Sequence, residues 1–132
     1  MNILRQEVVQ RAVAKHYQAV ASRESSAFGG NAFSEIEILT MGCHGALVVA
    51  IVNGEVIGHA GGMDGQCWTI AVDEAHQRRG VGRRLLSRLG ARDAAVLERN
   101  ITAQLFFRAC GWRCYRVEKH DAWDVYWFSV MP

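Results

Sequence analysis

Apolar and polar residues follow helical or strand periodicity along most of the chain, with turn signals between the periodic segments. Residues 4–21 place apolar side chains at helical spacing among Arg, Gln and Lys, which predicts an amphipathic helix. Residues 1–5 could instead begin a short strand. Residues 22–33 are polar and contain Gly29-Gly30-Asn31, so we expect a loop. Ser34-Glu35-Ile36-Glu37 matches a capping box, which predicts a short helix over residues 35–41.

The middle of the chain predicts a hairpin, then a strand, a turn and a helix. Residues 46–52 and 55–61 are apolar runs separated by Asn53-Gly54, the strongest short-range hairpin signal. Residues 66–72 are apolar and partly β-branched, as expected of a buried strand. A helix beginning at Val81 should end near Gly90, because glycine is common just past a helix C-terminus.

The last third of the chain predicts one more helix between strands. We expect a strand over residues 94–98, a helix over 101–110 ended by Gly111, and closing strands over 112–117 and 125–130. The chain has 132 residues and one continuous order of elements, so we expect a single domain over residues 1–132. This order predicts a mixed α/β sheet with helices on both faces.

The turn Gln77-Arg78-Arg79-Gly80-Val81-Gly82 joins the expected buried strand to the expected helix. Unpaired N–H groups and the helix dipole make such a helix N-terminus attractive to anions. Glycines let the backbone approach phosphate oxygens, and arginines add charge-assisted hydrogen bonds. The turn therefore predicts a phosphate-bearing cofactor. Neither a Walker lysine nor Gly-x-Gly-x-x-Gly occurs here, which argues against a nucleoside triphosphatase and a dinucleotide-binding fold.

Two motifs carry a resemblance to a known family. Residues 69–86, which contain this turn, resemble the pyrophosphate-binding signature of the GNAT superfamily of acetyl-CoA-dependent N-acetyltransferases. Asn100-x-x-Ala103, followed by Phe106-Phe107 and Gly111-Trp112, resembles the later Asn-x-x-Ala…Leu-Tyr…Gly-Phe segment of that family. The resemblance is sharp over about residues 68–112, although the spacing from Gly82 to Asn100 indicates a shortened middle segment.

The resemblance implies a mostly antiparallel sheet of about six strands, two of which splay apart to admit acetyl-CoA. It implies that acetyl-CoA donates an acetyl group to a primary amine of a small molecule or a protein. A chain that binds coenzyme A without catalysing transfer is the alternative. The residues expected to bind the cofactor are Ile70, Ala71, Val72, Gln77, Arg78, Arg79, Gly80, Val81, Gly82, Arg83, Asn100 and Phe107.

The candidates for proton transfer are few. Glu98 resembles in context the glutamate of ribosomal-protein N-terminal acetyltransferases and is the candidate general base. Gln66 stands where some relatives carry Glu, and Phe107 stands where many carry a Tyr that acts as general acid. Tyr115 is the first candidate to replace that acid and Tyr126 the second, unless coenzyme A leaves as a thiolate.

The acceptor pocket is expected from residues 22–45 and 118–123. Trp68 and Trp123 offer aromatic walls, and five acids would suit a cationic amine, namely Glu24, Glu35, Glu37, Asp121 and Asp124. Solvated acids and core tryptophans are the other interpretation of these residues. His59 ends a predicted hairpin strand and could face the acceptor.

Composition bears on the possible partners, the location and the state of the cysteines. The net charge of +2 argues against nucleic acid as a partner, although the arginine cluster keeps a basic nucleic-acid-binding domain as a rival hypothesis. No apolar run reaches the roughly 20 residues of a membrane span, so we expect a cytoplasmic protein. The four cysteines are expected to be buried free thiols, with no metal bound. Exposed strands near the C-terminus make a homodimer plausible.

Overall fold

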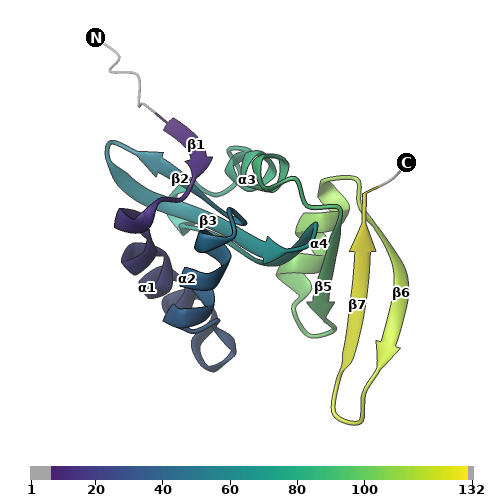
Figure 1. The fold of residues 1–132 in the computed structure, drawn as a ribbon. Helices are drawn as coiled ribbons and strands as arrows, with labels where there is room; N and C mark the ends of the chain where they lie inside the picture. Colours follow the sequence, from purple (N-terminus) through teal and green to yellow (C-terminus); the bar gives the residue numbers. More distant parts are fainter. Residues whose placement is uncertain (1–6, 131–132) are drawn as a thin grey trace.

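A computed structural model describes residues 7–130, and these residues form a seven-stranded sheet with helices on both faces (Figure 1). The strand order is β1-β2-β3-β4-β5-β7-β6. The strands are β1 (Glu7–Arg11), β2 (Leu47–Val52), β3 (Glu55–Met63), β4 (Gln66–Val72), β5 (Asp93–Leu97), β6 (Arg113–Lys119) and β7 (Asp124–Ser129). The helices are α1 (Tyr17–Phe28), α2 (Glu35–Cys43), α3 (Val81–Leu89) and α4 (Ile101–Ala109). The mixed, mostly antiparallel sheet that we expected is confirmed, with one strand more than the expected six.

The extra strand lies in the N-terminal segment, where the predicted helix over residues 4–21 is wrong. Residues 7–11 form β1, which pairs antiparallel with β2, and α1 begins only at Tyr17. Val8 and Val9 satisfy a helical and a strand pattern equally, and pairing with the edge of β2 decides between them. The helix then continues to Phe28, through half of the predicted loop over residues 22–33. The alternative strand over residues 1–5 lies outside the described residues.

The other predicted elements are confirmed to within a few residues. Asn53 and Gly54 have φ of 52° and 83°, so both turn residues of the β2–β3 hairpin adopt the positive φ that a type I′ turn requires. Helix α2 begins with the predicted capping box, in which the Ser34 hydroxyl accepts from the N–H of Glu37 at 3.2 Å. Gly90 (φ 73°) and Gly111 (φ 84°) follow α3 and α4.

Alternate residues of β2 pack on opposite faces of the sheet. Leu47 and Val49 pack with Val20 of α1 and with Ile38 of α2. Val48, Ala50 and Val52 lie in a second cluster with Val81 and Leu85 of α3. A third cluster joins β5 and β7 to α4 around Phe107, Trp112 and Phe128. Figure 1 shows α1 and α2 on one side of the sheet and α3 on the other.

The parallel pairing of β4 with β5 is short, and this opens the sheet. It covers Gln66↔Asp93 and Cys67↔Ala94 and ends there, although β4 continues to Val72 and β5 to Leu97. In Figure 1, β5, β7 and β6 accordingly run in a direction different from that of β2 and β3. Within residues 7–130, the edge of β4 from Trp68 to Val72 thus pairs with no residue of β5; we call the opening between this edge and β5 the slot.

Within residues 7–130, no helix is long and apolar enough to cross a membrane.

Candidate functional site

The turn before α3 has the geometry of an anion site. Arg78 and Gly80 have positive φ, 65° and 78°, and Gly80 is the residue that caps α3. Within residues 7–130 no side chain caps this helix, so the N–H groups of its first turn lack a side-chain partner there. A Cβ built on Gly80 has no atom of the described residues within 4 Å, so the space beside this glycine is open. The side chain of Gln77 donates to the Val72 carbonyl at 2.9 Å and so ties the turn to the end of β4.

The arginines of this turn have different surroundings. Arg78 and Arg79 are exposed in the turn itself. Arg83 donates to the Ala109 carbonyl at the end of α4, and Arg84 forms an ion pair with Glu7 of β1. The exposed guanidinium groups of Arg78 and Arg79 are therefore the ones best placed to meet an anion. Those of Arg83 and Arg84 link α3 to its neighbours.

Gly82 serves helix packing. A Cβ built there would lie 2.7 Å from Cε1 of Phe106, so α3 and α4 approach closely because this residue lacks a side chain. The expected cofactor-binding residue Gly82 thus has a structural reason of its own to be glycine.

Ile70, Ala71 and Val72 lie on β4 beyond its last pairing with β5. They pair with Ala60, His59 and Gly58 of β3 on one edge, which leaves the other edge of this backbone facing the slot. An extended ligand could add to that edge as a strand would. β4 is followed by the 3-10 turn Glu74–His76 and then by the turn at Gln77, so an arm bound along β4 and a phosphate bound at α3 would lie on consecutive segments of the chain.

Asn100 and Phe107, also expected at the cofactor, have clear structural roles. The Asn100 side chain caps α4 by accepting from the N–H of Ala103 at 3.1 Å. Phe107 is 2% exposed and packs on Trp112 and Phe128, with ring centroids 5.0 and 5.9 Å away. Its ring is enclosed by the core between α4 and β7, and the contact of Phe107 with the cofactor stays a prediction.

The candidates for proton transfer are not brought together. Tyr115 is 53% exposed on β6, the outermost strand, and β7 and β5 stand between β6 and the slot. At about 4.8 Å per strand, its backbone lies on the order of 10 Å from β5, so the topology argues against Tyr115 as general acid. Tyr126 is on β7, paired with Val96 of β5. Glu98 directly follows β5, and its Oε1 accepts from the N–H of Asp124 at 3.3 Å.

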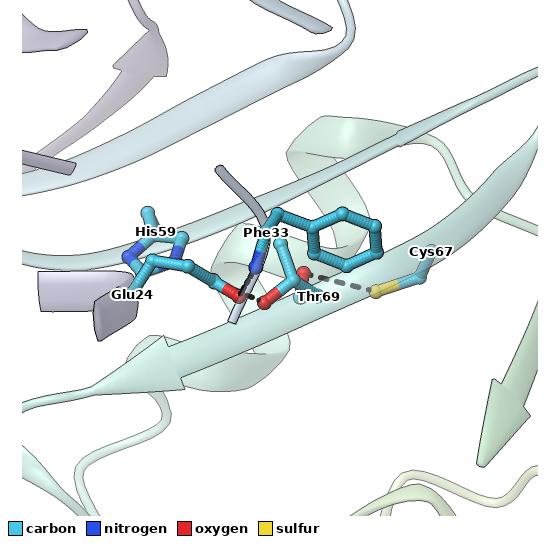
Figure 2. Close-up of polar contacts among 5 residues, drawn as sticks. All are labelled: Glu24, Phe33, His59, Cys67 and Thr69. Atoms are coloured by element: carbon cyan, nitrogen blue, oxygen red, sulfur yellow. Dashed lines mark hydrogen bonds and ion pairs between the residues drawn. The ribbon is translucent and has the colours of Figure 1, made fainter. Parts of the chain in front are cut away.

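A buried polar network lies on the α1 side of β3 and β4 (Figure 2). Oε1 of Glu24 accepts from Nε2 of His59 at 2.8 Å and from the hydroxyl of Thr69 at 2.6 Å. Oε2 of Glu24 accepts from the N–H of Phe33 at 3.0 Å. The three side chains of Glu24, His59 and Thr69 are between 0% and 5% exposed. Glu24 is thus not a solvated acid, and its buried carboxylate is not exposed to contact an amine substrate directly.

The charge of Glu24 follows from these contacts. Burial alone raises the pKa of this carboxyl group, but hydrogen bonds from His59, Thr69 and Phe33, together with the charge of His59, outweigh burial and lower the pKa. Glu24 is therefore ionised at neutral pH and can only accept. Sequence reasoning treated Glu24 and His59 separately, because 35 residues and a helix–strand contact lie between them.

An aromatic pair stands beside the network. Trp68 is 42% exposed and stacks on Phe33, with ring centroids 6.1 Å apart and an interplanar angle of 19°. Its indole N–H donates to Oε1 of Gln66 at 2.9 Å. Trp68 is the first residue of β4 beyond the last pair with β5. We call Phe33 and Trp68 the aromatic wall; it lies where the expected acceptor segment, residues 22–45, meets the opening of the slot.

The other expected acceptor segment, residues 118–123, covers the end of β6 and the turn to β7. There the rings of His120 and Trp123 pack with centroids 4.1 Å apart. Lys119 forms an ion pair with Asp124 at 3.0 Å. These contacts order the turn, and the N–H of Asp124 ties it to Glu98.

The four cysteines are free, as expected, but they are not all buried. Cys67 is buried, Cys110 and Cys114 are half-buried, and Cys43 is exposed at the end of α2. The expectation of buried thiols is therefore wrong for Cys43.

Comparison with known proteins agrees with this geometry. The family model described as acetyltransferase (GNAT) domain matches residues 43–114. The fold is similar to that of a GNAT family acetyltransferase from Bacillus cereus ATCC 10987, with 17% identity, a TM-score of 0.79, and coverage of 96% of this chain and 99% of that chain. No curated protein matches the sequence.

Two further solved structures share the fold at similarly low identity. The ribosomal-protein-S18-alanine N-acetyltransferase from Escherichia coli is 17% identical with a TM-score of 0.73, and the match covers 95% of this chain and 93% of that chain. The diaminobutyrate acetyltransferase EctA from Paenibacillus lautus, in complex with L-2,4-diaminobutyric acid and coenzyme A, is 15% identical with a TM-score of 0.75, and 95% of each chain is covered. At these identities the likeness shows the fold alone.

Proposed function

Because this chain belongs to the acetyltransferase (GNAT) family, we propose that it is an N-acetyltransferase that transfers an acetyl group from acetyl-CoA to a primary amine. The proposal treats residues 1–132 as one acetyltransferase domain. The observation that carries it is the slot: β4 and β5 separate after Cys67, and β4 is followed, through residues 73–80, by the N-terminus of α3, where the cap residue Gly80 offers no side chain.

The residues present fit acetyl-CoA, the acyl donor of this family. The open space beside Gly80 would accommodate a diphosphate, and its donors would be the N–H groups of residues 78–83 and the guanidinium groups of Arg78 and Arg79. The backbone of Ile70, Ala71 and Val72 would hold the extended arm of the coenzyme. When bound, acetyl-CoA supplies an acyl group activated as a thioester, and an N–H on this edge of β4 would polarise its carbonyl group.

The chain contributes mainly by positioning. Holding an amine and an acyl group in line contributes roughly 7–11 kcal/mol to rate acceleration in well-oriented systems. The aromatic wall offers a flat apolar surface to the acceptor at the opening of the slot. Glu98 remains our candidate general base because it follows β5, the far side of the slot. Tyr126 on β7 replaces Tyr115 as the candidate acid, and the alternative is that coenzyme A leaves as a thiolate.

A second candidate function is a regulatory or interaction module that binds coenzyme A without catalysis. In its favour, neither of two positions considered for a general acid offers a hydroxyl group beside the slot. Residue 107 is a buried Phe, and Tyr115 lies on β6, the far edge strand.

Two measurements separate the candidates. Isothermal titration calorimetry should detect binding of acetyl-CoA, and release of free thiol should follow when a panel of amines and peptides is added. Binding without thiol release on any amine would favour the module over the enzyme. If neither acetyl-CoA nor coenzyme A binds the folded protein, both candidates fail. Nucleic-acid binding that falls steeply with salt would then support the basic-domain hypothesis.

The proposed function also leads to expectations about the location of the protein and its oligomeric state. We propose a cytoplasmic protein, since acetyl-CoA and amine acceptors are available there. A homodimer could form through β6, an edge strand with exposed Tyr115 and Val117. Light scattering after size-exclusion chromatography measures the mass and decides between monomer and dimer.

A further inference from the structure

One buried carboxylate joins three parts of the chain that are remote in sequence. Glu24 near the end of α1 accepts from His59 on β3, from Thr69 on β4 and from the backbone of Phe33 before α2. Figure 2 shows the carboxylate and the side chain of Thr69 meeting above β4, with Phe33 next to them. The network thus fixes the connection between α1 and α2 to the middle of the sheet.

The network is a costly way to fill a core. A buried carboxylate must recover its lost hydration through hydrogen bonds, and apolar side chains of similar volume would often stabilise the fold as well or better. Because the ionised carboxylate can only accept, His59 must donate from Nε2. Nδ1 of His59 is then buried without a hydrogen-bond partner within residues 7–130. An unsatisfied buried polar atom adds to this cost, so the stability of the core does not by itself account for the network.

The position of the network suggests that role. Thr69 follows Trp68 on β4, where pairing with β5 has ended, and His59 is paired with Ala71, one of the residues expected along the slot. The Phe33 N–H that Glu24 binds belongs to the residue whose ring stacks on Trp68. The contact therefore fixes the aromatic wall relative to the separated part of β4. Helix α3 and the phosphate turn lie on the opposite side of the sheet, where Val81 and Leu85 pack.

We propose that Glu24 is a positioning residue of the acetyl-transfer site, which holds the aromatic wall, and with it the amine acceptor, against the open edge of β4. The proposal rests on the proposed acetyltransferase function. It follows that loss of the carboxylate affects the acceptor side of the reaction and leaves binding of the donor at α3 unchanged.

The test compares Glu24→Ala and Glu24→Gln with Val20→Ala. Val20 is a fully buried residue of the same helix that belongs to the apolar cluster, so its truncation controls for general loss of stability. Glutamine can satisfy the network when its carbonyl faces the Phe33 N–H and its amide group faces Thr69 and His59, with His59 in the Nδ1–H tautomer. Each variant is assayed at a temperature below its thermal unfolding transition, and the substrate is the amine that the wild-type chain acetylates best.

For Glu24→Ala we expect the KM for the amine to rise about tenfold, the effect of losing a hydrogen bond to a charged group, while the acetyl-CoA Kd from calorimetry stays within about twofold. Glu24→Gln should restore most of the wild-type KM, and Val20→Ala should leave it unchanged. A KM that rises equally in Val20→Ala, or an acetyl-CoA affinity that falls with the amine KM in Glu24→Ala, overturns the proposal.

A second readout does not depend on activity. Hydrogen exchange at the Phe33 amide, followed by NMR, should accelerate in Glu24→Ala and keep its wild-type rate in Val20→Ala. If the wild-type chain binds acetyl-CoA but acetylates no amine, the proposed function fails, and this exchange rate alone decides whether Glu24 holds the wall. An unchanged rate in Glu24→Ala would contradict the positioning role even in an active enzyme.

Discussion

At the scale of single residues, the two glycines of the phosphate turn have different reasons to be glycine. Gly80 has φ of 78° and open space around it, whereas Gly82 lies against the ring of Phe106. The sequence pattern predicted the pair as a unit for phosphate binding. Only the packing of α3 against α4, which joins residues remote in sequence, separates the two roles. Gly80 is therefore the position at which a substitution tests the anion site with least disturbance to the core.

Substitution of Gly80 by alanine should weaken donor binding. A Cβ at positive φ costs roughly 1–2 kcal/mol and stands in the space expected for the diphosphate. Gly54→Ala is the matched control, since Gly54 also has positive φ (83°) with nothing within 4 Å but lies in the β2–β3 turn. Urea unfolding should show similar losses of stability, whereas calorimetry should show weakened acetyl-CoA binding for Gly80→Ala alone. Equal affinities in the two variants would argue against phosphate binding at this turn.

The cysteines should differ sharply in reactivity. Burial raises the pKa of the Cys67 thiol to about 12, so it remains protonated and unreactive at neutral pH. Cys43 is exposed. Titration with a chromogenic disulfide reagent at pH 8 should modify Cys43 rapidly in the folded protein and Cys67 only after unfolding. Loss of the rapid phase in Cys43→Ser identifies it, and fast modification of Cys67 in folded protein would show that β4 opens readily.

The raised pKa of Cys67 also has a consequence for stability at alkaline pH. The unfolded thiol ionises near its ordinary value of 9, while the folded one stays protonated to about 12. The unfolded state therefore binds fewer protons in this window, and the contribution of Cys67 to stability decreases as the pH rises from 9 to 12.

At the scale of elements, local signals predicted most of the chain. Ser34 with Glu37, Asn53-Gly54 and the glycines after α3 and α4 act through contacts within a few residues, so the sequence alone reveals the boundaries they set. The failure at residues 7–11 has the opposite cause. Whether Val8 and Val9 form a helix or a strand depends on the free edge of β2, some forty positions later. The Glu24 network was missed for the same reason.

Substitutions of Asn100 can separate its role as the cap of α4 from a role in binding the cofactor. Its side chain caps α4, and replacing such a cap by alanine costs about 1 kcal/mol. Asn100→Ala should lower the free energy of unfolding by this amount, whereas Asn100→Ser should retain the cap and the stability. We expect Asn100→Ser to keep the wild-type acetyl-CoA affinity in calorimetry. A stable Asn100→Ser variant with weakened binding would instead support the predicted contact between Asn100 and the cofactor.

At the scale of the whole molecule, the slot exists because the sheet is held together by means other than strand pairing. Two residue pairs join β4 to β5, yet Ile70 and Leu89 pack against both the Leu85 cluster and the Phe107 cluster. Helix α3 thus holds the two halves of the sheet on one face. On the other face, Glu24 connects α1 and the segment before α2 to β3 and β4. The opening between the strands can therefore persist without exposing the core.

This connection makes the stability of the molecule depend on pH through Glu24. Its pKa is lowered in the folded state from the ordinary value of 4.5, so the folded state binds fewer protons than the unfolded state at acidic pH. The stabilisation is complete above about pH 4.5 and is lost as the pH falls through the folded pKa. Urea unfolding from pH 7 to pH 3 should show a gap in stability between wild type and Glu24→Gln that narrows below pH 4.5. The other carboxylates titrate in both proteins and cancel, so a gap that stays constant over this range would mean that the charge of Glu24 contributes nothing to holding α1 on the sheet.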